Sequence, residues 1–265
     1  MIPADQQSKI QAQIEGGQKL GHILDLLLEK AQVGVSLMSI ENEAQKLIAD
    51  AGGTPSFQTV EGYRWATCLC VDDEVVHGIP TEYVLNEGDV LTIDVGILFK
   101  GYHTDTAWTK IVTTKEKNSK TSLPTAEKTD IETFLSVGEE ALWESIAQAK
   151  AGNRIGHISQ ATQRVVEGGG YSIVKSLVGH TIGKELHEKP HVPGFLKGKI
   201  EATPLLVDGM TIAIEVIYAQ GNGSIVYAND DGWTIGMRDG SLAAVFEHSI
   251  LIDGDLPQVL TVSKK

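Results

Sequence analysis

The chain has 265 residues, of which 42% are hydrophobic and 22% are charged, and this composition is ordinary for a globular protein with an ample core. Its formal net charge of −13 argues against nucleic acid or an anionic membrane surface as the main partner. No apolar run approaches the length of a transmembrane helix, and the first residues lack the basic region and apolar core of a signal peptide.

Apolar spacing predicts helices in two similar parts of the chain. Residues 8–30 have the pattern of an amphipathic helix, and residues 31–52 contain a glycine turn followed by a second helix that ends in glycine. Residues 149–170 repeat this second pattern at an offset of 118 residues. We therefore expect two similar halves, each with helices over an antiparallel sheet, and a functional site at their junction.

A β-hairpin is predicted where two stretches rich in β-forming residues, 90–99 and 102–112, flank a Lys-Gly pair. If the turn is centred on this pair, Asp105 faces Gly96, and Asp94 shares a face with Gly96. The two aspartates then become diagonal neighbours, roughly 7–8 Å apart at the backbone and within reach of a shared ion. Because Gly96 has no side chain, we expect it to leave the space that such an ion needs.

The segment that follows the hairpin, residues 113–130, is polar, rich in Lys, Thr and Ser, and contains a proline. It predicts a surface insertion that joins the hairpin to a helix near residues 131–149. Because flexible loops tolerate added length at little cost in free energy, we expect this insertion to be dispensable for the chemistry of the protein.

Two histidines, His180 and His187, lie in a segment that also contains Gly179 and Gly183. Their separation of seven residues corresponds to a rise of roughly 10 Å on a helix, too far for one metal ion, and it would place them on opposite faces of a strand. The two glycines instead predict a bent segment that brings both imidazoles to one cavity. One histidine would then bind a metal ion while the other contacts the substrate, and His77, at an expected strand end, is a third candidate.

Glu215 and Glu247 each lie in the middle of an apolar stretch that is typical of a buried strand. Together with the hairpin aspartates they make four carboxylates, which would repel one another if they were buried without a counter-charge. The expected strands supply no lysine or arginine at matching positions. A pair of divalent metal ions bound by the carboxylates and an imidazole is the simplest counter-charge, and a two-metal site indicates hydrolysis.

In these features the chain resembles the type I methionine aminopeptidases, which belong to the pita-bread dinuclear metallopeptidases. The resemblance implies an α+β pita-bread fold, with two pseudo-twofold-related halves of antiparallel β-sheet covered by helices, in a single catalytic domain of residues 1–265. The likeness covers almost the whole chain and rests on six short stretches in the family's order: EVVHGIP at 74–80, the spacing of Asp94 and Asp105, GHTIGKELHEKP at 179–190, Ile214-Glu215, Asp231-Gly232-Trp233 and Phe246-Glu247-His248.

The resemblance also implies an activity and a setting. A family member would remove the N-terminal methionine from nascent proteins and peptides, preferentially when the second residue is small, by attack of a metal-activated water on the first peptide bond. It would act in the cytoplasm as a monomer, with neither nucleic acid nor a membrane as a partner. The ribosome is one partner that the sequence neither indicates nor excludes. Cys68 and Cys70, the only cysteines, agree with a reducing compartment, because two residues apart on one expected strand they are badly placed to form a disulfide.

Metal ligands follow from the resemblance position by position. One ion would be held by Asp94, Asp105 and Glu247, and the second by His180 and Glu215, with Asp105 and Glu247 bridging the two. Glu215 would in addition transfer a proton during the reaction. Oxygen-rich ligation with one imidazole suits Mn²⁺, Fe²⁺ or Co²⁺, and Zn²⁺ is also compatible.

Substrate contacts are implied in the same way. Two histidines that are not ligands in the family, His77 and His187, would hydrogen-bond the substrate and the tetrahedral intermediate. The methionine side chain would enter an apolar slot whose aromatic and sulfur-bearing walls suit a thioether. The residues that align with this slot are Tyr63, Cys68, Leu186 and Trp233.

Two other functions stay open at this point. The first is an X-Pro aminopeptidase of the same fold, but such enzymes usually carry a separate N-terminal domain for which this chain has no room. The second is a non-catalytic binding protein on the same scaffold, although such relatives typically lose metal ligands that this chain keeps. The chain also departs from the family: Val216 follows Glu215 where proline is usual, and Asp72 and Ala243 put a family monovalent-cation site in doubt.

Overall fold

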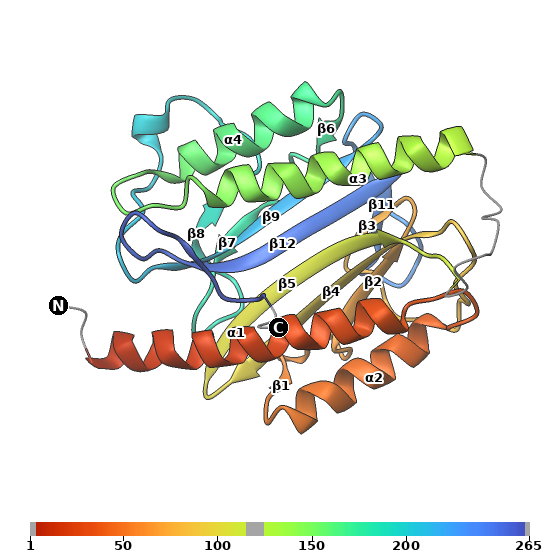
Figure 1. Ribbon diagram of the computed structural model, residues 1–265, viewed down its shortest axis with the longest axis horizontal. Helices are drawn as coiled ribbons and strands as arrows, with labels where there is room; N and C mark the ends of the chain where they lie inside the picture. Colours follow the sequence, from red (N-terminus) through yellow and green to blue (C-terminus); the bar gives the residue numbers. More distant parts are fainter. Residues whose placement is uncertain (1–3, 115–124, 263–265) are drawn as a thin grey trace.

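Helices cover one face of a large antiparallel sheet in this computed structural model, which describes residues 4–114 and 125–262 (Figure 1). The helices and strands, in chain order, are α1 (Ala4–Lys30), α2 (Leu37–Asp50), β1 (Thr54–Pro55), η1 (Phe57–Thr59, a 3₁₀ helix), β2 (Thr67–Val71), β3 (Glu74–Val76), β4 (Val90–Phe99), β5 (Tyr102–Ile111), α3 (Thr125–Ile146), α4 (Ile155–Gly168), β6 (Ser172–Ile173), β7 (Gly179–Thr181), β8 (Glu188–Val192), η2 (Ile200–Ala202), β9 (Thr211–Ala219), β10 (Ile225–Tyr227), β11 (Ile235–Met237), β12 (Ala243–Leu251) and β13 (Gln258–Val259). The central strands run in the order β4-β5-β12-β9, with shorter strands around them, and β10, β11 and β3 form a small second sheet.

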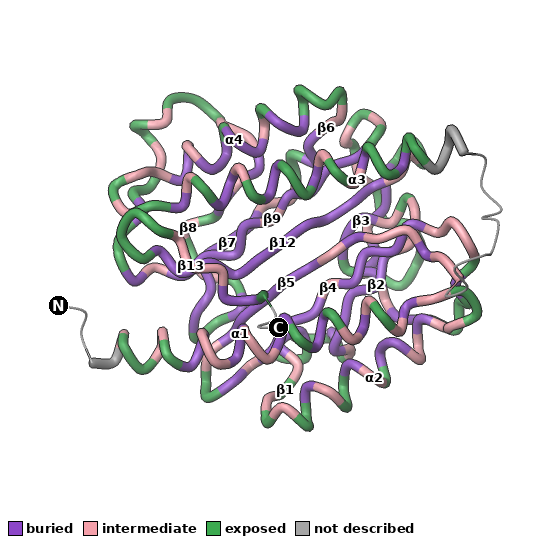
Figure 2. The backbone as a smooth tube through the Cα atoms, viewed as in Figure 1, coloured by how far each residue is buried: buried purple, intermediate pink, exposed green. Residues whose placement is uncertain are grey.

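Alternate side chains of the central strands face different surroundings, because successive side chains of a strand point to opposite faces of the sheet. On β9 and β12, Ile214 and Phe246 pack beneath α3 and α4, whereas Glu215 and Glu247, the next residues, point to the opposite face. On β4, Ile93 packs beneath α1 and α2 in the same way. Figure 2 shows the result, in which the central strands are buried along most of their length while the helices expose their outer sides.

Two similar halves make up the molecule, as the sequence repeat predicts. The first half contains α1, α2, β4 and β5, and the second half contains α3, α4, β9 and β12. Helices α2 and α4 begin at Leu37 and Ile155, an offset of 118 residues, and each has 14 residues. Each follows a glycine with positive φ, Gly34 at 86° and Gly152 at 88°, a conformation that only glycine adopts without a steric penalty.

The hairpin of β4 and β5 confirms the predicted register. Gly96 is paired with Asp105, and the turn residues Lys100 and Gly101 both have positive φ, at 50° and 82°. A two-residue turn with both residues in the left-handed region matches the twist of the flanking strands and therefore sets their register. Asp94 and Asp105 consequently lie on one face of the sheet.

The prediction of a loop through residues 113–130 is wrong at its end, because α3 begins at Thr125 and residues 125–130 are helical. Polar residues in this stretch suggest a loop, but Ala, Glu and Lys are good helix formers, and the apolar period that identifies the helix begins only at Ile131. Residues 115–124, which make up most of the rest of the segment, lie outside the described residues.

Side-chain hydroxyl groups join the two halves where β5 meets β12, and we call this junction the seam. Thr106 and Thr109 on β5 each donate a hydrogen bond of 2.8 Å to a carbonyl oxygen on β12. Ser249 on β12 accepts from the backbone N–H of Asp105 at 2.9 Å and donates to its carbonyl oxygen at 2.8 Å. Hydroxyl groups can both donate and accept, so they satisfy backbone groups at points where the two strands are not directly bonded.

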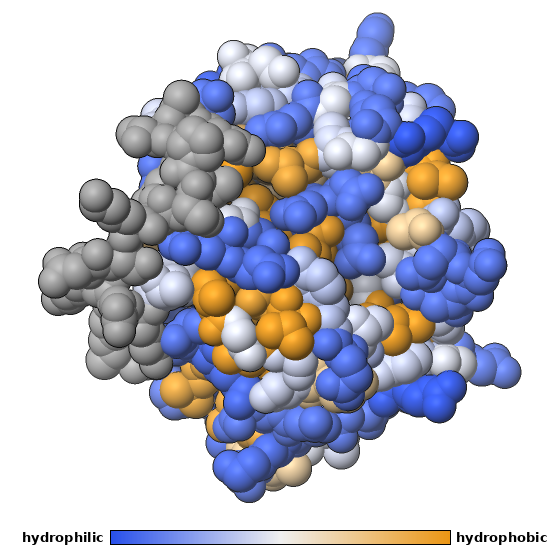
Figure 3. Space-filling view, turned by 90° about the vertical axis from the view of Figure 1, so that its right-hand side faces the viewer, coloured by the Kyte–Doolittle hydropathy of each residue, from blue (hydrophilic) through white to orange (hydrophobic). Residues whose placement is uncertain are grey.

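The distribution of hydrophobic residues on the surface agrees with a composition that is ordinary for a globular protein. On the face that Figure 3 shows, hydrophobic residues lie in separate patches divided by hydrophilic side chains. Scattered patches of this kind are normal on a surface that faces water. Within residues 4–114 and 125–262, none of the helices is both long enough and apolar enough to cross a membrane.

Candidate metal centre and substrate cavity

Four neighbouring strands bring acidic residues into one row across the sheet. Asp94 on β4 is paired with Ala107 on β5, Ala107 with Glu247 on β12, and Glu247 with Glu215 on β9. Because neighbouring strands lie about 4.8 Å apart and residues in one row point to the same face, these side chains can converge. Asp105 lies two residues before Ala107 and therefore shares this face.

The space beside Gly96 is filled by other residues, and the middle position of the row is occupied by Ala107. The expectation that Gly96 leaves room for an ion is wrong, because a Cβ atom there would lie 2.7 Å from the Cβ atom of Ser56 and 3.1 Å from the ring of Phe57. A segment far from the hairpin in sequence fills that space. Ala107 is fully buried, and its short side chain leaves the centre of the row free of longer groups.

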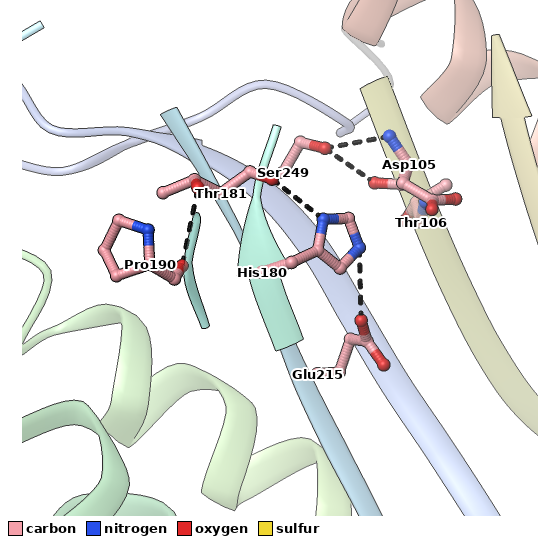
Figure 4. A network of polar contacts seen from close by, with 7 residues as sticks. All are labelled: Asp105, Thr106, His180, Thr181, Pro190, Glu215 and Ser249. Atoms are coloured by element: carbon pink, nitrogen blue, oxygen red, sulfur yellow. Dashed lines mark hydrogen bonds and ion pairs between the residues drawn. The ribbon is translucent and has the colours of Figure 1, made fainter. Parts of the chain in front are cut away.

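His180 approaches the row from β7, where it is paired with Ala213 on β9. Its Nδ1 atom lies 3.0 Å from the carbonyl oxygen of Thr181, and because a carbonyl can only accept, Nδ1 carries the proton and Nε2 keeps its lone pair. Nε2 lies 3.4 Å from Oε1 of Glu215, as Figure 4 shows. Burial, helped by nearby histidines, lowers the pKa of His180 to about 4, so at pH 7 the ring is in the neutral form that binds metal ions.

Burial raises the pKa of every carboxyl group at this site. The pKa of Asp105 is raised to about 7, and the pKa values of Asp94, Glu215 and Glu247 are raised well above their usual range by burial and by repulsion from the neighbouring carboxylates. Oδ1 of Asp94 and Oε1 of Glu247 are buried and have no hydrogen-bond partner among the described residues. Buried oxygens without a partner cost free energy unless a proton or a cation meets them.

These donors fit divalent metal ions. Asp105, His180 and Glu247 each offer a ligand atom, and these atoms all lie within 4.8 Å of one another. None of the described residues that line the cavity is a lysine or an arginine, so no such side chain there offsets the negative charge. Asp94 and Glu215 line the same cavity, and we call the five residues together the ligand cluster. They are the five candidate ligands that the sequence indicates.

Two further histidines line the cavity. His77 follows β3 with a φ of 58°, a strained conformation for a residue with a side chain and one that recurs at active sites. His187 lies between β7 and β8, and the centroid of its ring is 4.5 Å from that of His180, so the bent segment brings both rings to one cavity. Burial lowers the pKa of both His77 and His187, so near pH 7 each ring is neutral and can donate one hydrogen bond.

Gln13 on α1 holds the bent segment in place through hydrogen bonds. Its side chain is fully buried, and Nε2 donates to the carbonyl oxygens of His103 and Ile182 at 2.9 and 3.3 Å. The backbone N–H of His103, on β5, also donates to the carbonyl oxygen of Gly183 at 2.8 Å. Sequence reasoning missed Gln13, because one polar residue on an amphipathic helix carries no signal about what it contacts.

An apolar slot adjoins the ligand cluster. Tyr63, Cys68, Leu186 and Trp233, the four residues that the resemblance assigns to a slot, line the same cavity. The rings of Tyr63 and Trp233 meet edge to face at 5.1 Å, and Cys68 is the cross-strand partner of Asp94, so the slot borders the ligand cluster. The whole cavity, which includes the space at the ligand cluster as well as the slot, has a volume of about 160 Å³. Because a cavity of about 150 Å³ holds one benzene molecule, the slot, as part of this volume, has room for no more than one apolar side chain.

Sequence reasoning missed several other residues of the cavity wall: Phe57, Val60, Val76 and Val245. Phe57 and Val60 belong to η1 and the residue after it, and isolated apolar residues in such a segment look like ordinary core. Val245 lies two residues before Glu247 on the same face of β12, and Val76 directly precedes His77. Proximity to a predicted site residue is the signal that identifies these last two.

Comparisons with known proteins agree with this geometry. A family model described as metallopeptidase family M24 matches residues 14–253. A methionine aminopeptidase of Clostridium perfringens is 34% identical to this chain over 264 residues, which cover 100% of both chains. Methionine aminopeptidase 1 of Bacillus subtilis is 35% identical to it over 238 residues, which cover 90% of each chain. Among solved structures, a methionine aminopeptidase from Thermotoga maritima aligns with a TM-score of 0.88 at 32% identity, covering 99% of this chain and 100% of that one.

Proline-directed enzymes share the fold at lower identity. A prolidase from Pyrococcus furiosus aligns with a TM-score of 0.71 at 18% identity, and the alignment covers 97% of this chain but only 65% of the prolidase. A likeness at that identity shows the pita-bread fold alone. The methionine aminopeptidases, in contrast, are matched along their whole length.

Proposed function

Because the chain belongs to metallopeptidase family M24, we propose that it is a metal-dependent aminopeptidase that removes the N-terminal methionine from nascent proteins and peptides. The observation that best supports this proposal is that one cavity contains two features. Four buried carboxylates and a neutral imidazole converge there, and an apolar slot with room for one side chain borders them. The first feature suits hydrolysis, and the second suits selection of one N-terminal residue.

Two divalent ions are the proposed cofactors. Asp94, Asp105 and Glu247 would hold one ion, and His180 and Glu215 would complete the second, with Asp105 and Glu247 shared. Mn²⁺, Fe²⁺ and Co²⁺ suit this oxygen-rich set with one imidazole, and Zn²⁺ is also compatible. When bound, the ions supply Lewis acidity and lower the pKa of water to near neutrality.

The chain's own residues have separate proposed roles in the reaction. Glu215, whose pKa is raised by burial, would hold the proton that is taken from water and pass it to the leaving amine. His77 and His187, as neutral rings at the cavity wall, would donate hydrogen bonds to the substrate carbonyl and to the charge that develops on it. Tyr63 and Trp233 would hold the thioether and exclude water from the slot.

The setting of the enzyme is part of the same proposal. We place it in the cytoplasm as a monomer that acts on newly made chains, with the ribosome as a further contact to be tested. Support comes from Cys68 and Cys70, which are both buried free thiols, and from relatives that are named for action on methionine. A small second residue in the substrate is expected to be preferred, because the scissile bond must approach a deeply buried ligand cluster.

Hydrolysis of short peptides tests the proposal. Free methionine should be released from Met-Gly and Met-Ala peptides, faster than leucine from Leu-Ala, after the protein is loaded with Mn²⁺, Fe²⁺, Co²⁺ or Zn²⁺. Faster cleavage of Ala-Pro than of Met-Ala would favour the proline-directed alternative. Elemental analysis separates the other alternative, because a protein that only binds partners on this scaffold should neither retain these ions nor turn over any peptide.

A further inference from the structure

A buried carboxylate outside the cavity, Glu41, is fully occupied by hydrogen bonds. It lies on α2 with 1% of its surface exposed. Its Oε1 accepts from the backbone N–H of Ala66 at 2.8 Å and from Nε2 of Gln45 at 2.7 Å. Its Oε2 accepts from the backbone N–H of Thr67 at 3.0 Å and from the hydroxyl of the same residue at 2.6 Å. In contrast to the ligand cluster, this carboxylate has its counterparts within the protein.

These bonds fix the point where the preceding loop becomes strand β2. Ala66 and Thr67 are fully buried, and β2 is paired with β4 from Thr67 onward. On the other side of β2, Leu69 donates its backbone N–H to Gly78, whereas the N–H groups of Ala66 and Thr67 meet the carboxylate from α2. Glu41 therefore stands in for a strand partner, and without it two buried N–H groups would lack an acceptor.

The same short stretch carries two walls of the slot. The hydroxyl of Tyr63 donates to the carbonyl oxygen of Thr67 at 2.8 Å and lies 3.3 Å from Sγ of Cys68. The ring of Tyr63 in turn meets Trp233 edge to face. A shift of Thr67 would therefore displace Tyr63 and Cys68 together, whereas the ligand-cluster residues Asp105, Glu215 and Glu247 lie on strands that are not paired with β2.

We infer that Glu41 is a positioning residue that sets the width of the slot and with it the preference for methionine. The inference rests on the proposed function, because it assigns the slot to the first residue of the substrate. Glu41 does not line the cavity, and it acts only through Ala66 and Thr67. Substrate selection and not the rate of the chemical step should therefore depend on it.

The test compares Glu41→Gln with Thr67→Val and a matched control. A glutamine keeps the size of the side chain but turns one acceptor into a donor that faces other donors. Glu41→Gln should raise KM for Met-Ala-Ser about tenfold, leave kcat within about threefold, and lower the preference for methionine over leucine about tenfold, the scale on which apolar pockets discriminate. Thr67→Val removes one of the four bonds and should raise KM about two- to threefold.

The control is Ser159→Ala. Ser159 lies on α4, 118 residues after Glu41, and is buried, but its hydroxyl donates to the carbonyl oxygen of Ile155 in its own helix. This variant should keep the KM, kcat and selectivity of the parent. Circular dichroism and elemental analysis should show an unchanged fold and metal content in all three variants, and Thr67→Val keeps the test decisive if Glu41→Gln does not fold.

Binding of free methionine, followed by tryptophan fluorescence, separates this inference from the proposed function. If the parent releases no methionine from peptides, the proposed function fails, whereas weaker binding of free methionine by Glu41→Gln would still support the role in the slot. Unchanged KM and selectivity in a folded Glu41→Gln variant would overturn the inference. A fall in kcat and metal content at constant KM would overturn it too, because Glu41 would then support the fold in general.

Discussion

In the first half, β4 and β5 are joined by a two-residue turn, whereas in the second half β9 and β12 are separated by residues 220–242, which include β10 and β11. Asp94 and Asp105 are consequently diagonal neighbours in a hairpin, while Glu215 and Glu247 are direct partners at the ends of a long connection. The first pair of carboxylates is placed by local structure. The second pair is placed by the assembly of the whole sheet, although all four belong to one ligand cluster.

The halves also differ in what they add to the carboxylates. Each half contributes walls of the slot and one histidine that is not a candidate ligand, His77 in the first half and His187 in the second. Only the second half contributes an imidazole to the ligand cluster, that of His180. Neither half holds a complete site, so the first two predictions below compare a residue from one half with a residue from the other.

The largest effect is expected from removing one carboxylate of the ligand cluster in each half. Asp105→Asn and Glu247→Gln each remove a ligand atom that lies within 4.8 Å of the others. Metal content should fall, and the turnover of Met-Ala-Ser should fall by about 10³-fold or more, because a bound ion stabilises the transition state by several kcal/mol. Elemental analysis and kinetics measure both quantities. Normal metal content in either variant would show that the two halves do not share the ions.

A smaller effect is expected from the histidines that are not proposed as ligands. His77→Ala in the first half and His187→Ala in the second should each lower kcat by about 10²–10³-fold, the usual cost of losing one hydrogen bond to a developing charge. Metal content should stay near that of the parent, because His180 alone supplies a ring atom close to the other ligand atoms. An empty metal site in His187→Ala would mean that this histidine is a ligand, and the division of roles would be wrong.

The buried carboxyl groups should contribute to the pH dependence of the stability of the metal-free protein in an unusual direction. The pKa of Asp105 is raised to about 7 by burial, and the other three carboxyl groups are raised as well. A raised pKa means that the folded state binds the proton more tightly, so this contribution to stability is present below about pH 4 and is lost as the pH rises through about 7. Through these carboxyl groups, acidification from pH 7.5 to pH 5 should raise the melting temperature of the metal-free protein. The buried histidines act in the opposite direction, because the pKa of His180 is lowered to about 4 and the unfolded state therefore takes up that proton first. The contribution of the carboxyl groups is therefore measured as the difference between the parent and Glu247→Gln.

Two comparisons sharpen this prediction. Glu247→Gln should weaken the dependence of the melting temperature on pH in the metal-free protein, because one of the titrating groups is absent. The metal-loaded protein should show the opposite trend, since protons compete with the ions for the same oxygens. The same dependence of the melting temperature on pH in metal-free parent and metal-free Glu247→Gln would show that these carboxylates are not buried together.

The smallest effect is expected from the connection between the halves. Replacing residues 115–124 by a short Gly/Ser linker should leave turnover of Met-Ala-Ser within a few-fold of the parent, because this segment contains none of the candidate site residues and a change in the length of a loop costs only about 0.6 kcal/mol per doubling. Kinetics on this short peptide and on a longer one measure the effect. A large loss on the short peptide in a folded variant would place this connection at the cavity mouth.

Local sequence patterns were enough to predict the parts of the site that local structure determines. The Lys-Gly turn predicts that Asp105 faces Gly96, and the repeat of glycine and apolar spacing predicts α2 and α4 at the observed offset. The pairing of Glu215 with Glu247 could not be predicted in this way. Their strands are separated by residues 220–242, and no short turn sets the register between them. Their place in one cluster rested on charge balance and on the resemblance.

Contacts between distant segments account for what the sequence did not reveal. Gly96 was expected to leave space for an ion, but Ser56, from a segment forty residues earlier, occupies that space. Gln13 and Glu41 are buried polar residues on helices whose partners lie on other elements, and nothing in their own helices identifies those partners. The start of α3 was missed because its first residues are polar and carry no apolar period.

The seam joins residues that are far apart along the chain. The hydroxyl bonds of Thr106, Thr109 and Ser249 link positions between 136 and 144 residues apart. Contacts at such separations are expected to form late in folding. Closing a long stretch of chain costs entropy, and the favourable free energy of the contact is gained only after closure. During translation the hairpin can fold first, but it presents only Asp94 and Asp105. At the proposed metal centre, the growing polypeptide would therefore offer only two of the four carboxylates, and the complete set of candidate ligands would form only after synthesis has reached the last long strand.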